Sequence, residues 1–278
     1  MQYYADNTLT KFTTRLQKVL TLQGEWEIGL CEIAFTRSWF NVMEHEGHAI
    51  VIACSECYNK GPPPPSAKVL DNNVYEFSAH LPHGHYETVE TLLESINNSI
   101  QTRLAWVKEK LTSAGPLRSN IPIPIFKYNL LTRRAYVTLH RMFTVTLSES
   151  LIRLLGFNKK SRTLIPSPAE EYTTIFGKRP IDMQIGLQHL FVYTDIAEDV
   201  PVGDTCAPLL RIVNAEGKHG HTIHRIYDRP RYIPLQKKHF DSITIDIRDD
   251  AGQAVPFEYG KVVVTLHLKQ AKQSYFLQ

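Results

Sequence analysis

The stretch Glu25–Ile33, with the sequence EWEIGLCEI, alternates polar and apolar residues and decides the fold class. Successive side chains of an extended strand point to opposite faces, so Trp26, Ile28 and Leu30 are expected to face a hydrophobic core, together with the apolar residues that follow. The stretch therefore predicts a half-buried β-strand.

The same pattern recurs along the chain, in segments rich in Val, Ile, Thr, Tyr or Phe. The alternating segments are Asn73–His80, Ala135–His140, Phe143–Leu147, Ser242–Ile247 and Lys261–Leu268, and compact hydrophobic stretches lie at Ala49–Ala53, Leu190–Tyr193 and Leu209–Val213. Turn-forming clusters separate them, which predicts roughly ten strands. The predicted fold class is all-β, an antiparallel two-sheet jelly-roll sandwich with a helical insertion, in a single domain over residues 1–278.

Two segments break the strand pattern. From Thr88 the apolar residues recur at three- and four-residue steps, which predicts a helix over about residues 88–112 with Thr88 as its N-cap. A second, short helix is expected at Ser148–Leu155, between the Ser148 cap and Gly156. Residues from about 158 to 182 contain prolines and basic residues with little periodicity, so we expect a long loop of the kind that usually exists for contacts.

The composition excludes several function classes. With 43% hydrophobic and 21% charged residues the chain is an ordinary globular protein, and its net charge of +3 is too small to predict binding of nucleic acid by bulk charge. The longest apolar runs are far shorter than the about 20 residues that a bilayer span needs. The first residues carry no secretory signal, so synthesis in the cytosol is expected. Four cysteines do not form a disulfide framework in a chain of 278 residues.

One group of residues has the ligand types of a tetrahedral zinc site. Cys54 and Cys57 form a C-x-x-C pair, and His45 and His48 lie just upstream. A single pair of each kind is a weak motif, and both lie beside an apolar stretch, so a buried or edge pair of thiols is the favoured interpretation.

Other histidine and carboxylate groups favour structural roles. His83–Glu87 resembles a metal motif of small barrels, but it runs directly into the predicted helix, so a strand-to-helix turn is favoured. The histidines within His219–His224 are expected on a solvated strand, and Asp249–Gly252 is expected to form a hairpin turn. The sequence contains no Gly-x-Ser-x-Gly, Walker or His-Glu-x-x-His motif. We therefore expect no enzymatic activity and no cofactor.

Several stretches, taken in order, form a recognisable set. They are Asp6–Thr13, Gly24–Leu30, Leu81–Tyr86, Leu154–Phe157, Val202–Arg211, Asp228–Pro230 and Phe240–Leu268. Together they resemble the minor, penton-type capsid protein of Maverick/Polinton elements, large virus-like DNA transposons whose capsid genes are similar to those of virophages. The resemblance spans almost the whole chain.

The resemblance implies a single jelly roll that assembles as a homopentamer at capsid vertices, beside a separate double jelly-roll major capsid protein. It implies a component of the virion capsid, made in the host cytoplasm, with no catalytic residues. We expect contacts from the long loop and from the Val202–Arg211 segment, which mixes Gly, Pro and apolar residues. The expected contact residues are Lys159, Lys160, Arg162, Gly203, Asp204 and Arg211.

Two other functions fit a β-sandwich. One is a glycan- or receptor-binding module, since jelly rolls also serve as lectins, and the other is a cupin-like metalloenzyme, which would need a bound metal. The mass of the chain in solution distinguishes these two functions from the capsid role, because a discrete pentamer is hard to reconcile with either alternative.

Overall fold

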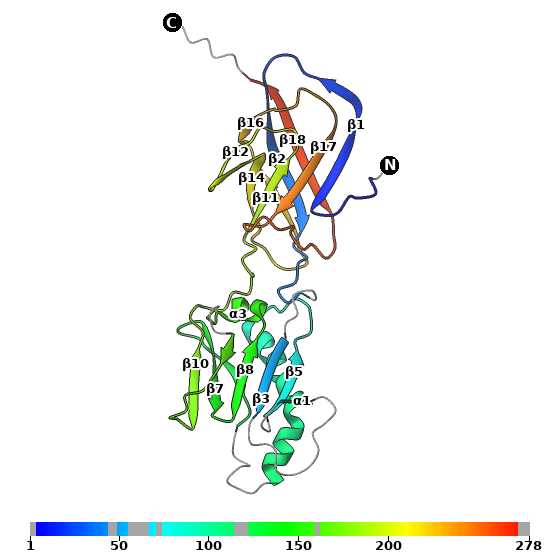
Figure 1. Cartoon of the computed structure of the whole chain (residues 1–278). Coiled ribbons are helices and arrows are strands. Elements are labelled where there is room, and N and C mark those ends of the chain that lie inside the picture. The colour runs from blue at the N-terminus through cyan, green and yellow to red at the C-terminus, as the bar shows by residue number, and fades with distance from the viewer. Residues whose placement is uncertain are drawn as a thin grey trace. The chain divides into compact units, whose positions relative to one another are not determined.

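The computed structural model describes residues 4–43, 49–54, 67–70, 74–113, 122–158 and 162–271. The chain divides into two compact units (Figure 1). We call Met1–Trp39 with Gly186–Gln278 the discontinuous unit, and Phe40–Ile185 the inserted unit. The sequence predicts one domain over residues 1–278, whereas the contacts of the structure cluster into these two units.

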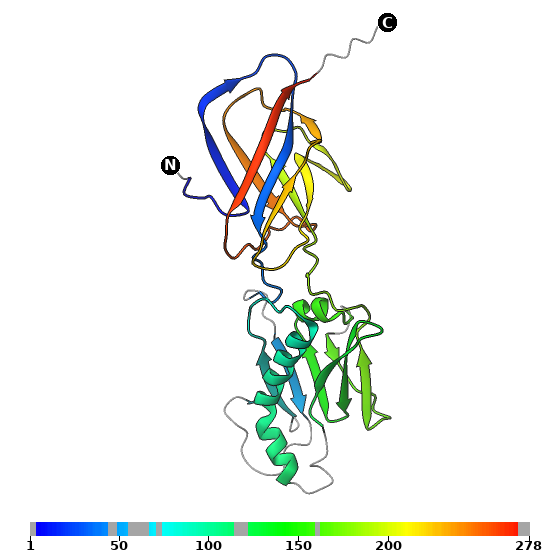
Figure 2. The ribbon, with the colours of Figure 1, turned by 180° about the vertical axis from the view of Figure 1, so that it is seen from behind.

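The discontinuous unit is built from two antiparallel sheets (Figure 2). In order, the first sheet contains β1 (Lys11–Thr21), β17 (His239–Arg248), β11 (His189–Thr194) and β14 (Leu209–Asn214). In the second sheet β2 (Trp26–Thr36) pairs with β18 (Val262–Gln270) on one side, and with β15 (Thr222–Ile226) and β16 (Tyr232–Pro234) on the other. A hairpin of β12 (Val200–Val202) and β13 (Thr205–Ala207) precedes β14.

Strand β2 confirms the strand predicted at Glu25–Ile33. Ile28 and Leu30 are fully buried, while Trp26 is half-buried and its Nε1 donates to a backbone carbonyl at 2.9 Å. The register with β18 then shifts, so that one residue of β2 has no counterpart and forms a β-bulge. Beyond the bulge Ile33 and Phe35 occupy the buried side, which explains why three positions separate Leu30 from the next buried residue.

The inserted unit also contains two antiparallel sheets. The larger sheet has the order β4 (Ala67–Leu70), β5 (Val74–His80), β3 (Ala49–Cys54), β8 (Phe143–Leu147) and β9 (Thr163–Leu164). The smaller sheet has the order β10 (Tyr172–Phe176), β7 (Arg134–His140) and β6 (Ile125–Asn129). Every strand pair in the described ranges is antiparallel, so the predicted all-β class, a sandwich of the jelly-roll kind with a helical segment, agrees with the structure.

Both predicted helices are present in the inserted unit. Helix α1 (Val89–Ser113) begins after Thr88, whose Oγ1 accepts the N–H of Thr91 at 3.2 Å, as an N-cap does. Helix α3 (Glu149–Leu155) begins after the Ser148 cap and ends at Gly156, which has a φ of 74°. The α1 stripe that packs into the core consists of Leu92, Leu93, Ile96, Ile100, Leu104 and Val107. No helix in the described part of the chain is both long and apolar enough to cross a bilayer.

The segment from 158 to 182, predicted as a long loop, contains strands β9 and β10. Strand β10 pairs with β7 over its full length, from Tyr172 opposite His140 to Phe176 opposite Tyr136. The prediction of a loop was wrong here because the strand lies at the edge of its sheet and buries none of its side chains fully. Its sequence, YTTIF, therefore does not alternate between polar and apolar residues as a core strand does.

Candidate assembly surfaces

The sandwich of the discontinuous unit has two different flanks. Strands β1 and β18 are edge strands of the two sheets and lie on the same side of the unit in both views (Figures 1 and 2). Strands β14 and β15 form the other side. We call these the β1/β18 flank and the β14/β15 flank, and they are the surfaces at which a neighbouring chain could extend or cover a sheet.

Side chains close the β14/β15 flank. The Arg225 guanidinium, from β15, donates to the carbonyl oxygen of Asn214 at 3.3 Å and to that of Glu216 at 2.9 Å. Next to it the guanidinium carbon of Arg211, from β14, lies 3.6 Å from the ring centroid of Tyr227. These contacts join the two sheets, and a cation over an aromatic ring adds an electrostatic attraction to the packing.

The β1/β18 flank has no such closure. Within the described residues no hydrogen bond or ion pair joins β1 to β18, because the side-chain bonds of β1 go to β17, as in Thr13 with Thr244 at 3.0 Å. No side chain of either strand is fully buried. Val19 on β1 and Val263 on β18 are each 54% exposed. This flank therefore presents two long, partly apolar edges to solvent.

The predicted contact residues fall in both units. Gly203 and Asp204 are exposed at the tip of the β12–β13 hairpin, where the φ of Gly203 is 64°, and Arg211 follows on β14. Arg162 lies in the inserted unit, and its Nη2 donates to Glu149 Oε2 at 2.9 Å between two well-exposed side chains. Lys159 and Lys160 lie outside the described residues. Sequence reasoning did not find the contact of Arg211 with Tyr227, because Tyr227 lies on a different sheet.

The cysteine–histidine group shows no zinc site in the part of the chain that the structure describes. Cys54, at the end of β3, is buried and disulfide-bonded, so the expectation that it is a free thiol was wrong. A sulfur in a disulfide is not a thiolate ligand. His45, His48 and Cys57 lie outside the described residues. Across the described ranges no three His, Cys, Asp or Glu side chains come together as a metal site would require.

The other histidines occupy structural positions. The segment around His83 is extended and leads into α1, as the strand-to-helix interpretation predicts, and the ring of His83 lies 6.4 Å from that of Phe40. His224 on β15 bonds through Nε2 to the Glu32 carboxylate of the neighbouring strand β2. The ring of His219 lies 6.3 Å from that of Tyr259.

The acidic residues near the end of β17 are bound locally. The Asp246 carboxylate accepts two hydrogen bonds from the Arg248 guanidinium, at 2.7 and 3.0 Å, and this bonding raises the pKa of Arg248 above its ordinary value. Asp249 accepts the N–H groups of Ala251 and Gln253, which confirms the predicted turn. Asp246 thus bonds a neighbouring side chain, and Asp249 holds the backbone of the turn.

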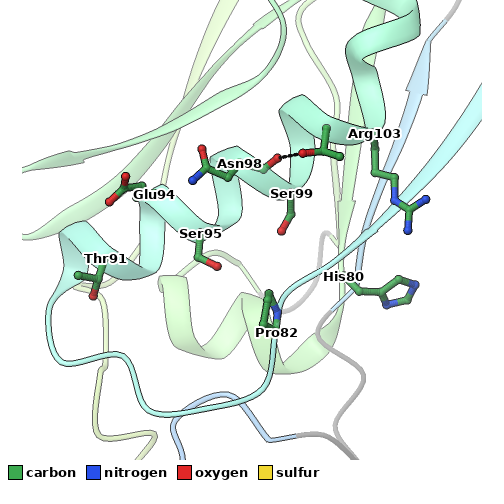
Figure 3. A pocket seen from close by; sticks show the side chains of 9 residues that line it. His80, Pro82, Thr91, Glu94, Ser95, Asn98, Ser99 and Arg103 are labelled. Atoms are coloured by element: carbon green, nitrogen blue, oxygen red, sulfur yellow. Dashed lines mark hydrogen bonds between the residues drawn. The ribbon is translucent and has the colours of Figure 1, made fainter.

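A hollow of about 500 Å³ lies beside α1 in the inserted unit (Figure 3). Its lining consists of Thr91, Glu94, Ser95, Asn98, Ser99, Thr102 and Arg103 from α1, with His80 and Pro82 from and after β5. Figure 3 shows these mostly polar side chains along one face of the helix.

The chain is thus an all-β protein of two units. Its candidate contact surfaces are edge strands and hairpin tips. Among solved structures, the chain is similar to the mavirus penton protein, with 9% identity, a TM-score of 0.47, and coverage of 94% of this chain and 90% of that one. It is also similar to a chain in the cryo-EM structure of the Sputnik virophage, with 10% identity, a TM-score of 0.40, and coverage of 96% and 94%.

No protein-family model and no curated protein matches the chain.

Proposed function

We propose that this chain is a penton-type minor capsid protein of a Maverick/Polinton-like element. Five copies form a ring at each vertex of the particle, beside a double jelly-roll major capsid protein. The ordered set of sequence motifs supports this function. The observation that carries it is the difference between the two flanks, because a sandwich with one open and one closed flank is suited to join copies of itself in one direction.

The symmetry of a ring explains why unequal flanks matter. A five-fold ring repeats one heterologous contact, in which a surface of one copy meets a different surface of the next. The β1/β18 flank supplies the open edges with Val19 and Val263. The β14/β15 flank supplies Ile212 and Ile226, whose side chains are 47% and 65% exposed. In the proposed ring these two apolar surfaces cover each other, with the Gly203–Asp204 tip beside them.

The role is structural. The ring is a component of the virion capsid, and the chain is made in the host cytoplasm before assembly. It needs no cofactor, because its task is to present surfaces that close a ring and contact the surrounding shell.

A pair of substitutions tests the ring contact. Replacing Val19 and Val263 together by Glu places charges on the open flank without touching the core, since both side chains are largely exposed. We expect the five-chain species to disappear from the masses measured in solution. Leu131→Glu is the control, because Leu131 is 96% exposed in a turn of the inserted unit, and it should leave the ring intact. A double variant that assembles like the parent would contradict the proposed contact.

A second set tests the contact with the major capsid protein. Lys159, Lys160 and Arg162 are replaced together by Glu, which breaks only the exposed Arg162–Glu149 ion pair among the described contacts and should cost less than about 1 kcal/mol of stability. We expect a folded protein whose co-assembly into particles is weakened. Co-assembly equal to that of the parent would show that this segment is not an interface.

A further inference from the structure

The three-stranded sheet of the inserted unit has one covered edge and one open edge. At the β6 edge the Asn97 side chain, from α1, accepts the N–H of Phe126 at 2.8 Å and donates to the carbonyl oxygen of Phe126 at 2.9 Å. The Asn97 amide thus forms the hydrogen bonds to the Phe126 N–H and C=O that a neighbouring strand would otherwise form. Strand β10 forms the other edge and lies at the outer side of the unit in Figures 1 and 2.

The backbone of β10 is arranged to pair with a further strand. The hydrogen bonds from Gly177 N–H to Ala135 and from Arg141 N–H to Glu171 show that the odd-numbered residues of β10 face β7. In an antiparallel ladder the intervening residues then direct their N–H and C=O groups outward. Those residues are Tyr172, Thr174 and Phe176. Within the described residues no hydrogen bond of these outward groups is found.

The side chains at the same positions are exposed. Tyr172 is 40% and Phe176 is 47% exposed on the outer face of the sheet. Each already stacks against a ring of β7, with 5.2 Å between the centroids of Tyr136 and Phe176, and 5.2 Å between those of His140 and Tyr172. An exposed aromatic edge of this kind is a template for pairing.

The charges around β10 identify the partner. The strand is preceded by Glu170 and Glu171 and followed by Lys178 and Arg179, all exposed. In the described part of the chain Glu170, Lys178 and Arg179 form no ion pair. Because an antiparallel copy reverses the order, the acidic end of one strand would face the basic end of the other. The sequence is therefore complementary to itself.

We propose that β10 pairs antiparallel with β10 of a second copy of this chain, in a register centred on Thr174. In this register Tyr172 faces Phe176 of the second copy, and Glu170 faces Lys178 of the second copy. The outward N–H and C=O groups of both strands then bond to each other, since they occupy the positions that face each other in hydrogen-bonded pairs. The two three-stranded sheets then form one continuous sheet. On each side of the register centre, Tyr136 and Phe176 of one copy lie in line with Tyr172 and His140 of the second copy.

This contact is isologous, because the same surface serves on both copies. It cannot be one of the contacts within a five-fold ring, which are heterologous. It therefore joins copies from two different rings, or two single chains where no ring forms. The pairing of β10 does not depend on the proposed capsid function.

Charge exchange tests the partner and the register together. Native mass spectrometry compares the full-length parent, Glu170→Lys, Lys178→Glu, and an equal mixture of the two variants at the same concentration. We expect paired species for the parent, half that mass for each variant alone, and paired species again in the mixture, where two cations of one chain face two carboxylates of the other. Absence of pairing in the parent, persistence in either variant, or no restoration in the mixture would overturn the proposal.

A backbone test checks the hydrogen bonds. Thr174→Pro removes the outward N–H at the centre of the register without removing a backbone hydrogen bond to β7, and edge strands tolerate proline at such positions. It also removes the bond of the Thr174 hydroxyl to Thr138 on β7. The control Thr174→Ala removes the same hydroxyl and keeps the N–H. We expect the proline variant to lose the paired species and the alanine variant to keep it. Circular dichroism establishes that both are folded, and equal pairing by folded variants would contradict strand pairing.

Discussion

The two flanks of the discontinuous unit end their sheets in opposite ways. On the β14/β15 flank two arginines connect the sheets, through carbonyl oxygens and through the Tyr227 ring. On the β1/β18 flank two long edge strands have no described bond to each other and bury no side chain fully. The three-stranded sheet of the inserted unit repeats this contrast, with Asn97 at one edge and the open strand β10 at the other. The comparison separates edges that the chain's own side chains bond from edges whose backbone has no such cover.

The largest expected effect lies in the core between the flanks. Leu30 is fully buried on β2, so Leu30→Ala should lower the free energy of unfolding by about 2–5 kcal/mol. Val263→Ala, on the open edge, should change it by less than about 0.5 kcal/mol. Denaturant unfolding of both variants measures the difference. A similar loss for the two would show that the edge is not open in solution.

A smaller effect is expected at the covered edge of the three-stranded sheet. Asn97→Ala leaves the N–H and C=O of Phe126 without the amide that bonds them, which should cost about 1–3 kcal/mol. Asn98→Ala is the matched control, because it changes the same residue type one position along α1 on its exposed side. Thermal unfolding monitored by circular dichroism compares them. Equal unfolding midpoints for the two variants would show that Asn97 does not stabilise this edge.

The smallest effect concerns the closed flank. Arg211 and Tyr227 are both partly exposed residues, so the coupling of the guanidinium with the ring should be about 0.5–1 kcal/mol. A double-mutant cycle with Arg211→Ala and Tyr227→Ala separates this coupling energy from the effect of losing each side chain. Additive single effects would mean that the stacking does not stabilise the flank.

The core of the fold could be predicted from the sequence because burial leaves a periodic signal. The α1 stripe and the strands β5, β7 and β8 follow the predicted segments closely, and the caps at Thr88 and Ser148 are where the residue types indicate. Edge strands leave a weaker signal. Strands β1 and β10 bury no side chain fully, so their sequences alternate little between polar and apolar residues, and neither strand was predicted.

The division into two units could not be predicted for a related reason. The chain passes between the units near Trp39 and near Gly186 without a proline-rich or polar linker, so composition does not mark the boundaries. Of the candidate surface, Gly203 and Asp204 were selected from residue types, and the structure places them at an exposed hairpin tip. The contact of Arg211 with Tyr227 could not, because it depends on which sheet edges lie side by side.

The central claim is that copies of this chain close into a five-fold ring through unequal flanks. The most direct test is the native mass of the full-length Lys178→Glu variant, in which pairing through β10 is removed while both flanks are unchanged. The account predicts a discrete species of five chains. A single chain at the highest accessible concentration, or a closed assembly of another number of chains, would contradict it.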